Sequence, residues 1–410
     1  MAVLAFFMDI QEGHLLPSFG LATMLKKRGH TVIFVSAIDN RQYIIEQGFL
    51  FYPAFEKLYP RGWREILKQR TKVGVYTPKI EIGHLDLLIN GELDSFFREY
   101  RPDLLIVSTF LKYEALILHY KYNINPVIFT PYLREKGNSL TRECFNEIVN
   151  FADDASRIVE FLFSKGIRFK TLDQLLHPLS LFPELVVCPR EFEMFDPEQS
   201  GHVHYIGPAI REGRPGYSQD ILKPLPADKR IIYASLGSQV SNYDQYARAF
   251  FAAMIRVMGY DEMRDFHLLL TVKGVADKSS LPAIPKNVDI YDWVPQTEIL
   301  KRASIAVTHG GLGTVKECIF YGVPMIVVPI AHDQPSNGKR VEFHHLGKAL
   351  NIHDLSESLL KECILSVAFD ENIKRSVLDM QYVFRAQQES ECGAQIIENI
   401  LSNRNRWVHQ

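Results

Sequence analysis

Residues that could carry chemistry gather in one stretch of the second half of the chain, between Trp293 and Asn337. Within it, the segment Thr308–Glu317 reads THGGLGTVKE, a strand end that turns through three glycines into a helix. The first backbone N–H groups of a helix lack internal partners, and the helix dipole adds attraction for an anion. Glycines allow a diphosphate to approach the backbone closely. The segment therefore predicts an anion-binding loop, and Trp293 offers an aromatic face for a nucleotide base.

Polar side chains beside this loop extend the prediction to a sugar nucleotide. His309 and Thr314 can donate hydrogen bonds to phosphate oxygens, and Glu317 can accept from ribose hydroxyls. Asp333 and Gln334 follow the next expected strand at its carboxyl end, where open α/β sheets bind ligands. Glycine turns are common and a lone tryptophan is more often part of a core, so each feature alone says little. Their order within one segment favours a hydroxylated sugar linked to a nucleotide diphosphate.

One residue of the first half has the chemistry of a general base. His14 lies in a polar loop, Asp9–Leu16, directly after the apolar run Val3–Met8. A neutral imidazole there can take a proton from an attacking hydroxyl. The simpler interpretation is a loop histidine that is hydrogen-bonded to the backbone. His30 has the same Gly-His spelling but begins the next expected strand, so it is interpreted as structural.

Two strand–helix series must position these residues. Val3–Met8 and Thr31–Ser36 are apolar runs typical of strands buried on both faces of a parallel sheet, and a helical pattern from Pro17 to Arg28 separates them. The same order begins again at Arg230–Leu236 and continues through strands ending at Thr308 and Pro329. The chain is therefore expected to form two doubly wound α/β domains that face one another across a cleft.

Domain limits follow from the same patterns. Residues 1–206 are predicted to form an acceptor-binding domain and residues 228–387 a nucleotide-sugar-binding domain. Residues 207–227 are rich in Pro, Gly and charge and are predicted to be a linker. A last helix is expected within 388–410.

Composition limits the class of protein. A chain of 410 residues with 47% hydrophobic residues, 23% charged residues and a net charge of -2 is typical of a globular protein and argues against nucleic-acid binding. Its five cysteines form no metal-binding pattern, and no Asp-x-Asp motif predicts a metal site. The N-terminus lacks a basic signal region, and no apolar run approaches the roughly 20 residues that span a bilayer. A cytoplasmic protein is expected.

The stretch from Trp293 to Asn337 resembles the nucleotide-sugar motif of family 1 glycosyltransferases, which include plant UDP-glycosyltransferases and bacterial macrolide and antibiotic glycosyltransferases. The opening Gly13–His30 and the loop Ser235–Ser238 resemble the same family, so the resemblance covers nearly the whole chain. It implies the two-domain GT-B fold with the active site in the cleft. It also implies that the last helix, within 388–410, packs back on the first domain, where Trp407 could anchor it. It also implies a set of donor contacts: Trp293 stacked on the base, the Val294 backbone at its edge, Gln296 and Glu317 on the ribose, Ser238, His309, Gly311, Gly313 and Thr314 around the diphosphate, and Asp333 and Gln334 on the sugar.

The sequence departs from the plant form of the motif at three positions. Gly310, Leu312 and Gly313 stand where that form has Cys, Trp and Asn. The residues of this chain are those of the bacterial type. The choice between uracil and thymine therefore stays open. A UDP-sugar or a TDP-sugar is expected as the co-substrate, with no other cofactor and no metal.

The resemblance implies His14 as the base, with an aspartate on its other nitrogen. The position of that aspartate falls on Ser108, so the usual partner is absent. Asp103 begins the same expected strand and is too far away. Ser108, Thr109, Glu12 or another carboxylate could take its place, or the acceptor could be acidic enough to need less help.

The resemblance implies an inverting, metal-independent hexosyltransferase with a small-molecule acceptor, acting as a monomer or homodimer. Aromatic residues in the first-domain segments 49–90 and 132–183 indicate a largely apolar acceptor, although such residues are as often core: Tyr52, Phe55, Tyr59, Trp63, Phe145, Phe151, Phe161 and Phe163. Basic residues within 56–79 predict a solvated surface or, alternatively, an acceptor-binding or membrane-associating one. Three alternatives remain: a lipid-linked-sugar glycosyltransferase, a nucleotide-sugar epimerase, and a non-catalytic sugar-nucleotide-binding partner protein.

Overall fold

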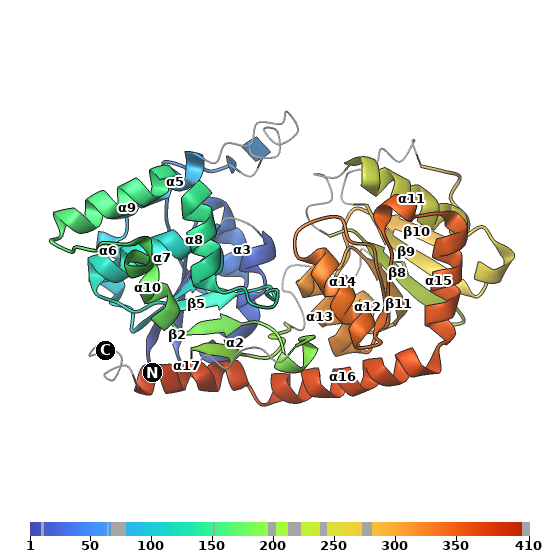
Figure 1. Ribbon diagram of the computed structural model, residues 1–410. Coiled ribbons are helices and arrows are strands. Elements are labelled where there is room, and N and C mark those ends of the chain that lie inside the picture. Colours follow the sequence, from blue (N-terminus) through green and yellow to red (C-terminus); the bar gives the residue numbers. More distant parts are fainter. Residues whose placement is uncertain are drawn as a thin grey trace. The chain divides into compact units, whose positions relative to one another are not determined.

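The apolar runs form parallel strands, and the chain is divided into two units. The computed structural model describes residues 1–9, 12–63, 65–66, 79–150, 152–195, 202–211, 223–237, 244–272 and 281–403 (Figure 1). Ser238, Phe151, Trp407, most of the expected linker and most of the basic segment 56–79 lie outside these residues. Within them, no helix is long and apolar enough to cross a membrane.

The first unit is built on a seven-stranded parallel sheet in the order β3-β2-β1-β4-β5-β6-β7 (Figure 1). Side chains that alternate along β1 enter two different apolar clusters, because successive residues of a strand point to opposite faces. The strands are β1 (Val3–Phe7), β2 (Thr31–Ser36), β3 (Leu50–Pro53), β4 (Leu104–Ser108), β5 (Val127–Thr130), β6 (Glu184–Val186) and β7 (Val203–Tyr205).

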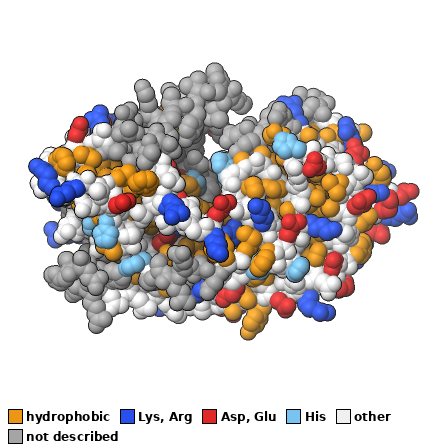
Figure 2. Space-filling view, in the orientation of Figure 1, with side chains coloured by type: hydrophobic (Ala, Val, Ile, Leu, Met, Phe, Trp, Pro, Cys, Tyr) orange, Lys and Arg blue, Asp and Glu red, His pale blue; other side chains and the backbone are white. Residues whose placement is uncertain are grey.

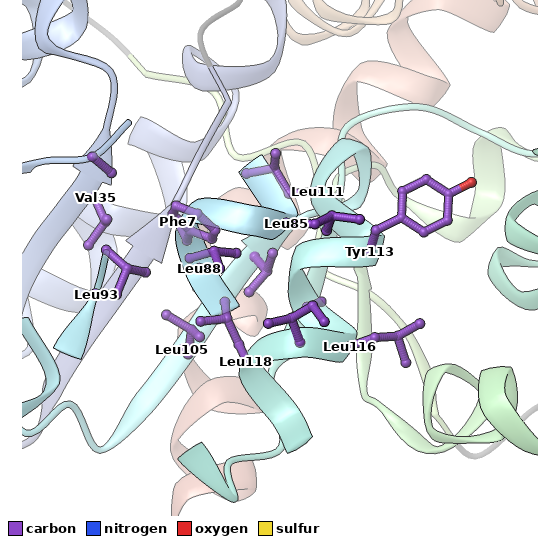
Figure 3. Packing of buried hydrophobic residues seen from close by; sticks show 14 of the residues in the cluster. Phe7, Val35, Leu85, Leu88, Leu93, Leu105, Leu111, Tyr113, Leu116 and Leu118 are labelled. Atoms are coloured by element: carbon purple, nitrogen blue, oxygen red, sulfur yellow. The ribbon is translucent and has the colours of Figure 1, made fainter. Parts of the chain in front are cut away.

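Helices cover both faces of this sheet. Phe7 and Leu105 pack with Leu85, Leu88 and Leu116 from two helices on one face (Figure 3). The helices of the unit are α1 (Glu12–Leu15), α2 (Ser18–Lys27), α3 (Arg41–Glu46), α5 (Lys79–Ile89), α6 (Asp94–Tyr100), α7 (Lys112–Tyr122), α8 (Leu140–Asn150), α9 (Ala152–Ser164), α10 (Leu172–Leu181) and α17 (Cys392–Ser402).

The helix α17 belongs to this first unit although it comes last along the chain. It packs on α2, where Gly393 lies so close to its neighbours that a Cβ would be 3.1 Å from both Ile206 and Leu21. Arg28 pairs with Glu398 and Glu391 at 2.6 and 3.1 Å. The N-terminal unit therefore takes one of its helices from the C-terminal end of the described chain.

The second unit has a six-stranded parallel sheet in the order β10-β9-β8-β11-β12-β13. Its elements are β8 (Arg230–Ser235), α11 (Asp244–Val257), β9 (Phe266–Thr271), β10 (Val288–Tyr291), α12 (Gln296–Leu300), β11 (Ala303–Thr308), α13 (Leu312–Tyr321), β12 (Met325–Val327), α14 (Gln334–Phe343), β13 (Gly347–Ala349), α15 (Glu357–Phe369) and α16 (Glu371–Glu389). Basic and acidic side chains are interspersed with apolar ones on the visible face of this unit, in keeping with the small net charge (Figure 2).

The unit limits differ in detail from those expected. Segments 1–187, 197–209 and 391–410 make up the first unit, whereas 188–196 joins the second. A buried ion pair ties that short segment down, because the Arg340 guanidinium donates to Glu193 Oε2 at 2.9 Å and both side chains are buried. Sequence patterns do not reveal such a pair, since its members are 147 residues apart.

Two further expectations change with the structure. The loop expected over Asp9–Leu16 contains the short helix α1. Most of the aromatic residues assigned to acceptor loops are core residues: Phe55, Tyr59, Trp63 and Phe161 are buried, and only Phe145 and Phe163 of the described ones are exposed, while Tyr52 is partly buried. Those buried rings are part of the apolar core of the first unit.

Candidate active site

Both sheets reverse their strand order at one point, and the candidate residues lie at those two points. In the second unit the reversal falls between β8 and β11, where Ser235 pairs with Thr308. The loops that follow them carry Gly237 and His309. A Cβ at Gly237, which has a φ of +78°, would lie 2.4 Å from His309 Cε1. The glycine loop thus packs directly against the imidazole, at the position where open α/β sheets bind ligands.

His309 is held as a neutral side chain. Its Nδ1 lies 3.3 Å from Thr308 Oγ1. Burial lowers the pKa of His309 to about 4, because desolvation penalises the charged form. A neutral imidazole presents one N–H donor, which suits a phosphate oxygen.

The glycine turn after His309 is fixed by a buried amide. Gly310 has a φ of +85°, and a Cβ there would lie 2.4 Å from Val327, so another residue would be strained and crowded. Asn337 is fully buried and donates to the Gly310 carbonyl at 2.9 Å and to Asp333 Oδ2 at 2.8 Å. Asn337 therefore links the turn to the start of α14 and orients the Asp333 carboxylate.

Three of the predicted donor residues meet at the first turns of α12 and α13. The Gln296 amide donates to Glu317 Oε2 and, at 3.4 Å, to Thr314 Oγ1. Tyr233 donates from its hydroxyl to Gln296 Oε1 at 2.9 Å. A carboxylate, an amide and a hydroxyl side by side match the hydroxyl groups of a ribose. Tyr233 is a supporting residue that the sequence analysis did not single out.

The remaining residues predicted to bind the sugar donor differ in their burial and in the free space around them. Gly311 caps α13, and a Cβ there would lie 2.6 Å from His309 Nε2, whereas a Cβ at Gly313 would meet nothing within 4 Å. Trp293 is partly buried, and Val294 is 3% exposed. Gln334 is 8% exposed.

Gln334 has a structural role besides the predicted one. Its carboxamide oxygen accepts hydrogen bonds from the backbone N–H groups of Ile330 and Ala331 at 2.8 and 3.0 Å. The oxygen is therefore occupied by the loop that leads into α14. The amide NH₂ group is the part of Gln334 left for a sugar hydroxyl.

The first unit places a carboxylate on His14 that the sequence analysis did not identify. The reversal of strand order falls between β1 and β4, where Phe7 pairs with Val107. Asp9 follows β1, and both of its carboxylate oxygens lie 2.9 Å from His14 Nδ1. Ser108, at the end of β4, donates to Asp9 Oδ2 at 2.9 Å. The residue at the expected aspartate position thus contacts the carboxylate and not the imidazole.

A signal for Asp9 was present in the sequence. It is the first residue after the apolar run Val3–Met8, at the carboxyl end of a strand, where functional side chains of such sheets gather. The resemblance places the expected aspartate at Ser108. Glu12, one of the expected substitutes, has a side chain outside the described part of the structure. Asp103 lies at the other end of β4 and accepts from the Val3 backbone N–H at 2.8 Å.

An aromatic side chain covers one face of His14. The rings of Phe110 and His14 are stacked, with centroids 3.6 Å apart and planes inclined by 10°. Phe110 is nevertheless 42% exposed, and Tyr132 contacts it at a centroid distance of 5.6 Å. The candidate base is therefore bordered by an exposed apolar surface.

Comparison with known proteins shows which proteins the chain is similar to. Residues 203–389 match the family model described as UDP-glucoronosyl and UDP-glucosyl transferase. The chain is 24% identical to the NDP-glycosyltransferase YjiC of Bacillus licheniformis over 97% of its own length and 98% of that protein. It is 25% identical to the demethyllactenocin mycarosyltransferase of Streptomyces fradiae, over 98% and 87%.

A solved structure shows the same fold. The glycotransferase of kitacinnamycin superposes with a TM-score of 0.76 at 23% identity, covering 97% of this chain and 98% of that one. Two Rossmann-like parallel sheets of the GT-B type are thus confirmed, as the sequence predicted. The chain is thus similar over nearly its whole length to glycosyltransferases, and its residues 203–389 match the UDP-glucoronosyl and UDP-glucosyl transferase model.

Proposed function

We propose that the chain transfers a hexose from a UDP- or TDP-sugar to a hydroxyl group of a small, largely apolar acceptor, with inversion at the anomeric carbon. The observation that carries the proposal is the state of His14. Its Nδ1 is taken by Asp9, and its Nε2 makes no hydrogen bond to a described residue. A histidine held in this way offers Nε2 as a general base.

The chemical step follows from this assignment. The acceptor hydroxyl gives its proton to His14 Nε2 as its oxygen forms a bond to the anomeric carbon. The bond from that carbon to the diphosphate oxygen breaks, and its electron pair leaves with the nucleoside diphosphate. Direct attack by the acceptor from the face opposite the leaving group converts an α-linked donor into a β-linked product.

The second unit supplies the residues that stabilise the leaving diphosphate. Neutral His309, the Thr314 hydroxyl and the free N–H groups at the start of α13 are all donors, and the helix dipole favours negative charge there. These groups provide the neutralisation that a bound metal provides in other transferases, so we propose a metal-independent reaction. Turnover that persists at full rate in excess EDTA supports this, and turnover restored only by a divalent cation contradicts it.

The acceptor class is proposed from Phe110. An aromatic ring that is 42% exposed beside the base favours an acceptor with an apolar or aromatic face, since burying that ring against a ligand is favourable. Small natural products have such faces.

One experiment tests the proposal as a whole. Several UDP- and TDP-sugars are paired with a panel of phenolic and polyketide acceptors, products are detected by mass spectrometry, and the anomeric configuration is read by NMR. We expect a gain of one hexose mass and a β-linked product. The His14→Ala variant should have a kcat lower by about 10²- to 10⁴-fold. Retention of configuration, or a His14→Ala variant as active as the unmodified chain, would refute the mechanism.

A further inference from the structure

Asp9 occupies a site in the fold that is built to hold a carboxylate against His14. Its backbone carbonyl accepts from Asn40 Nδ2 at 3.2 Å, and Asn40 also donates to Ser36 Oγ at 2.8 Å. Ser36, Asn40 and Ser108 are each at most 1% exposed. Asp9 is thus held at its carbonyl by Asn40 and at its carboxylate by Ser108.

We propose that Asp9 is the positioning residue for His14, and that the carboxylate is provided from the end of β1 while Ser108, at the end of β4, holds it in place. This inference rests on the proposed function, because it assigns a role within the same reaction. The inference goes beyond the proposed function by assigning the carboxylate to the end of β1 and its support to Ser108 and Asn40.

The geometry explains how Asp9 acts. A carboxylate at Nδ1 favours the tautomer that carries its hydrogen there, so Nε2 keeps its lone pair for the acceptor proton. The same carboxylate stabilises the imidazolium that forms during transfer. The Ser108 hydroxyl occupies one carboxylate oxygen, which limits rotation of the carboxylate away from the ring.

The positions of Asp9 and Ser108 are interchangeable in principle. β1 and β4 are neighbours in register, and the two side chains already lie within 2.9 Å of one another. Exchanging them leaves the total charge and the set of side chains unchanged and moves the carboxylate from one strand end to the next.

The experiment compares four variants of the full chain. Asp9→Asn and Asp9→Ser remove the carboxylate, Ser108→Asp alone places two carboxylates in contact, and the double variant Asp9→Ser with Ser108→Asp exchanges them. Asp103→Asn is the matched control, because Asp103 accepts a backbone N–H at the opposite end of the same two strands. For each variant kcat and KM are measured with a phenol and with an alkyl alcohol as acceptors, together with nucleoside diphosphate affinity and thermal unfolding.

We expect Asp9→Asn and Asp9→Ser to lower kcat by about 10²- to 10⁴-fold with the alcohol, and by less with the more acidic phenol, at unchanged KM for the donor. Ser108→Asp alone should also be impaired, because two facing carboxylates repel one another. The exchanged variant should regain at least about tenfold over Asp9→Ser. Asp103→Asn should keep kcat.

Two results would overturn the inference. The first is an exchanged variant no more active than Asp9→Ser although it unfolds at the same temperature as the unmodified chain. The second is a loss in Asp9→Asn that is equal for both acceptors, as expected from a role in folding alone. His14→Ala separates the two proposals: if it is inactive while Asp9→Asn is fully active, only the positioning role fails, and if it is fully active, the base assignment fails as well.

Discussion

Gly313 provides a sensitive test of where the diphosphate lies. It is the second residue of α13, is exposed, and an added Cβ would meet nothing within 4 Å. Its φ is not in the left-handed region, so alanine fits the backbone without strain. Gly313→Ala should therefore raise the free energy of unfolding by about 0.4–1 kcal/mol, because alanine loses less chain entropy on folding. The second unit should melt about 1–4 °C higher.

The same methyl group should weaken donor binding. If the diphosphate passes over this turn, the methyl occupies part of its space, and overpacking by one such group costs about 1–3 kcal/mol. That corresponds to a rise of about 5- to 150-fold in the dissociation constant of UDP or TDP, measured by titration calorimetry. The expected variant is thus more stable but binds donor less well.

Gly311→Ala is the matched control, two residues away. Its Cβ would lie 2.6 Å from His309 Nε2, so we expect a loss of stability of about 1–3 kcal/mol as well as weaker binding. The reasoning is refuted if Gly313→Ala lowers the melting temperature. It is refuted equally if the variant gains stability while its affinity for UDP and TDP stays unchanged.

Three further predictions concern stability and acceptor use. Because the folded-state pKa of His309 is about 4, below the usual 6.5, its contribution to stability is present above pH 6.5 and decreases as the pH falls towards 4, by about 1–2 kcal/mol at pH 5. The urea midpoint should therefore change less between pH 7 and pH 5 in His309→Gln than in the unmodified chain, and equal changes would contradict this. Arg340→Ala should cost about 3–5 kcal/mol, because it removes the guanidinium that pairs with the buried Glu193 carboxylate, whereas Arg340→Met with Glu193→Leu should recover most of this loss. A loss below about 1 kcal/mol in chemical denaturation would rule this out. Phe110→Ala should lower kcat/KM for aromatic acceptors by about 2- to 10-fold at constant donor KM, and an effect on donor KM alone would disprove the acceptor assignment.

The donor half of the site could be predicted because its residues are close in sequence. Gln296, Thr314 and Glu317 lie within about two dozen positions of one another, and the strand-to-helix turn that joins them has a clear glycine signature. The longer strands were predictable for a similar reason, since buried parallel strands are continuous apolar runs. The three-residue strands β6, β7 and β13 are too short for such a pattern and acquire their conformation from pairing.

The catalytic half was harder to predict because its contacts join residues far apart in the sequence. Asp9 and Ser108 are 99 positions apart, and only the neighbouring arrangement of β1 and β4 brings them together. The sequence shows a serine at position 108, but it does not show that Asp9 lies against His14. Gln334 illustrates a second limit, since hydrogen bonds to backbone groups have no sequence signature.

The placement of α17 in the first unit has a consequence for how the chain is made. During synthesis the ribosome produces all of the second unit, through Ser390, before the helix that completes the first. Until then the surface that α17 covers, including Leu21 and Ile206, is exposed to solvent or to other binding partners. The N-terminal unit is therefore expected to reach its final stability after the C-terminal one, the reverse of the usual order in cotranslational folding. Ribosome-stalled chains that end before and after residues 391–403 should differ in the protease resistance of the first unit.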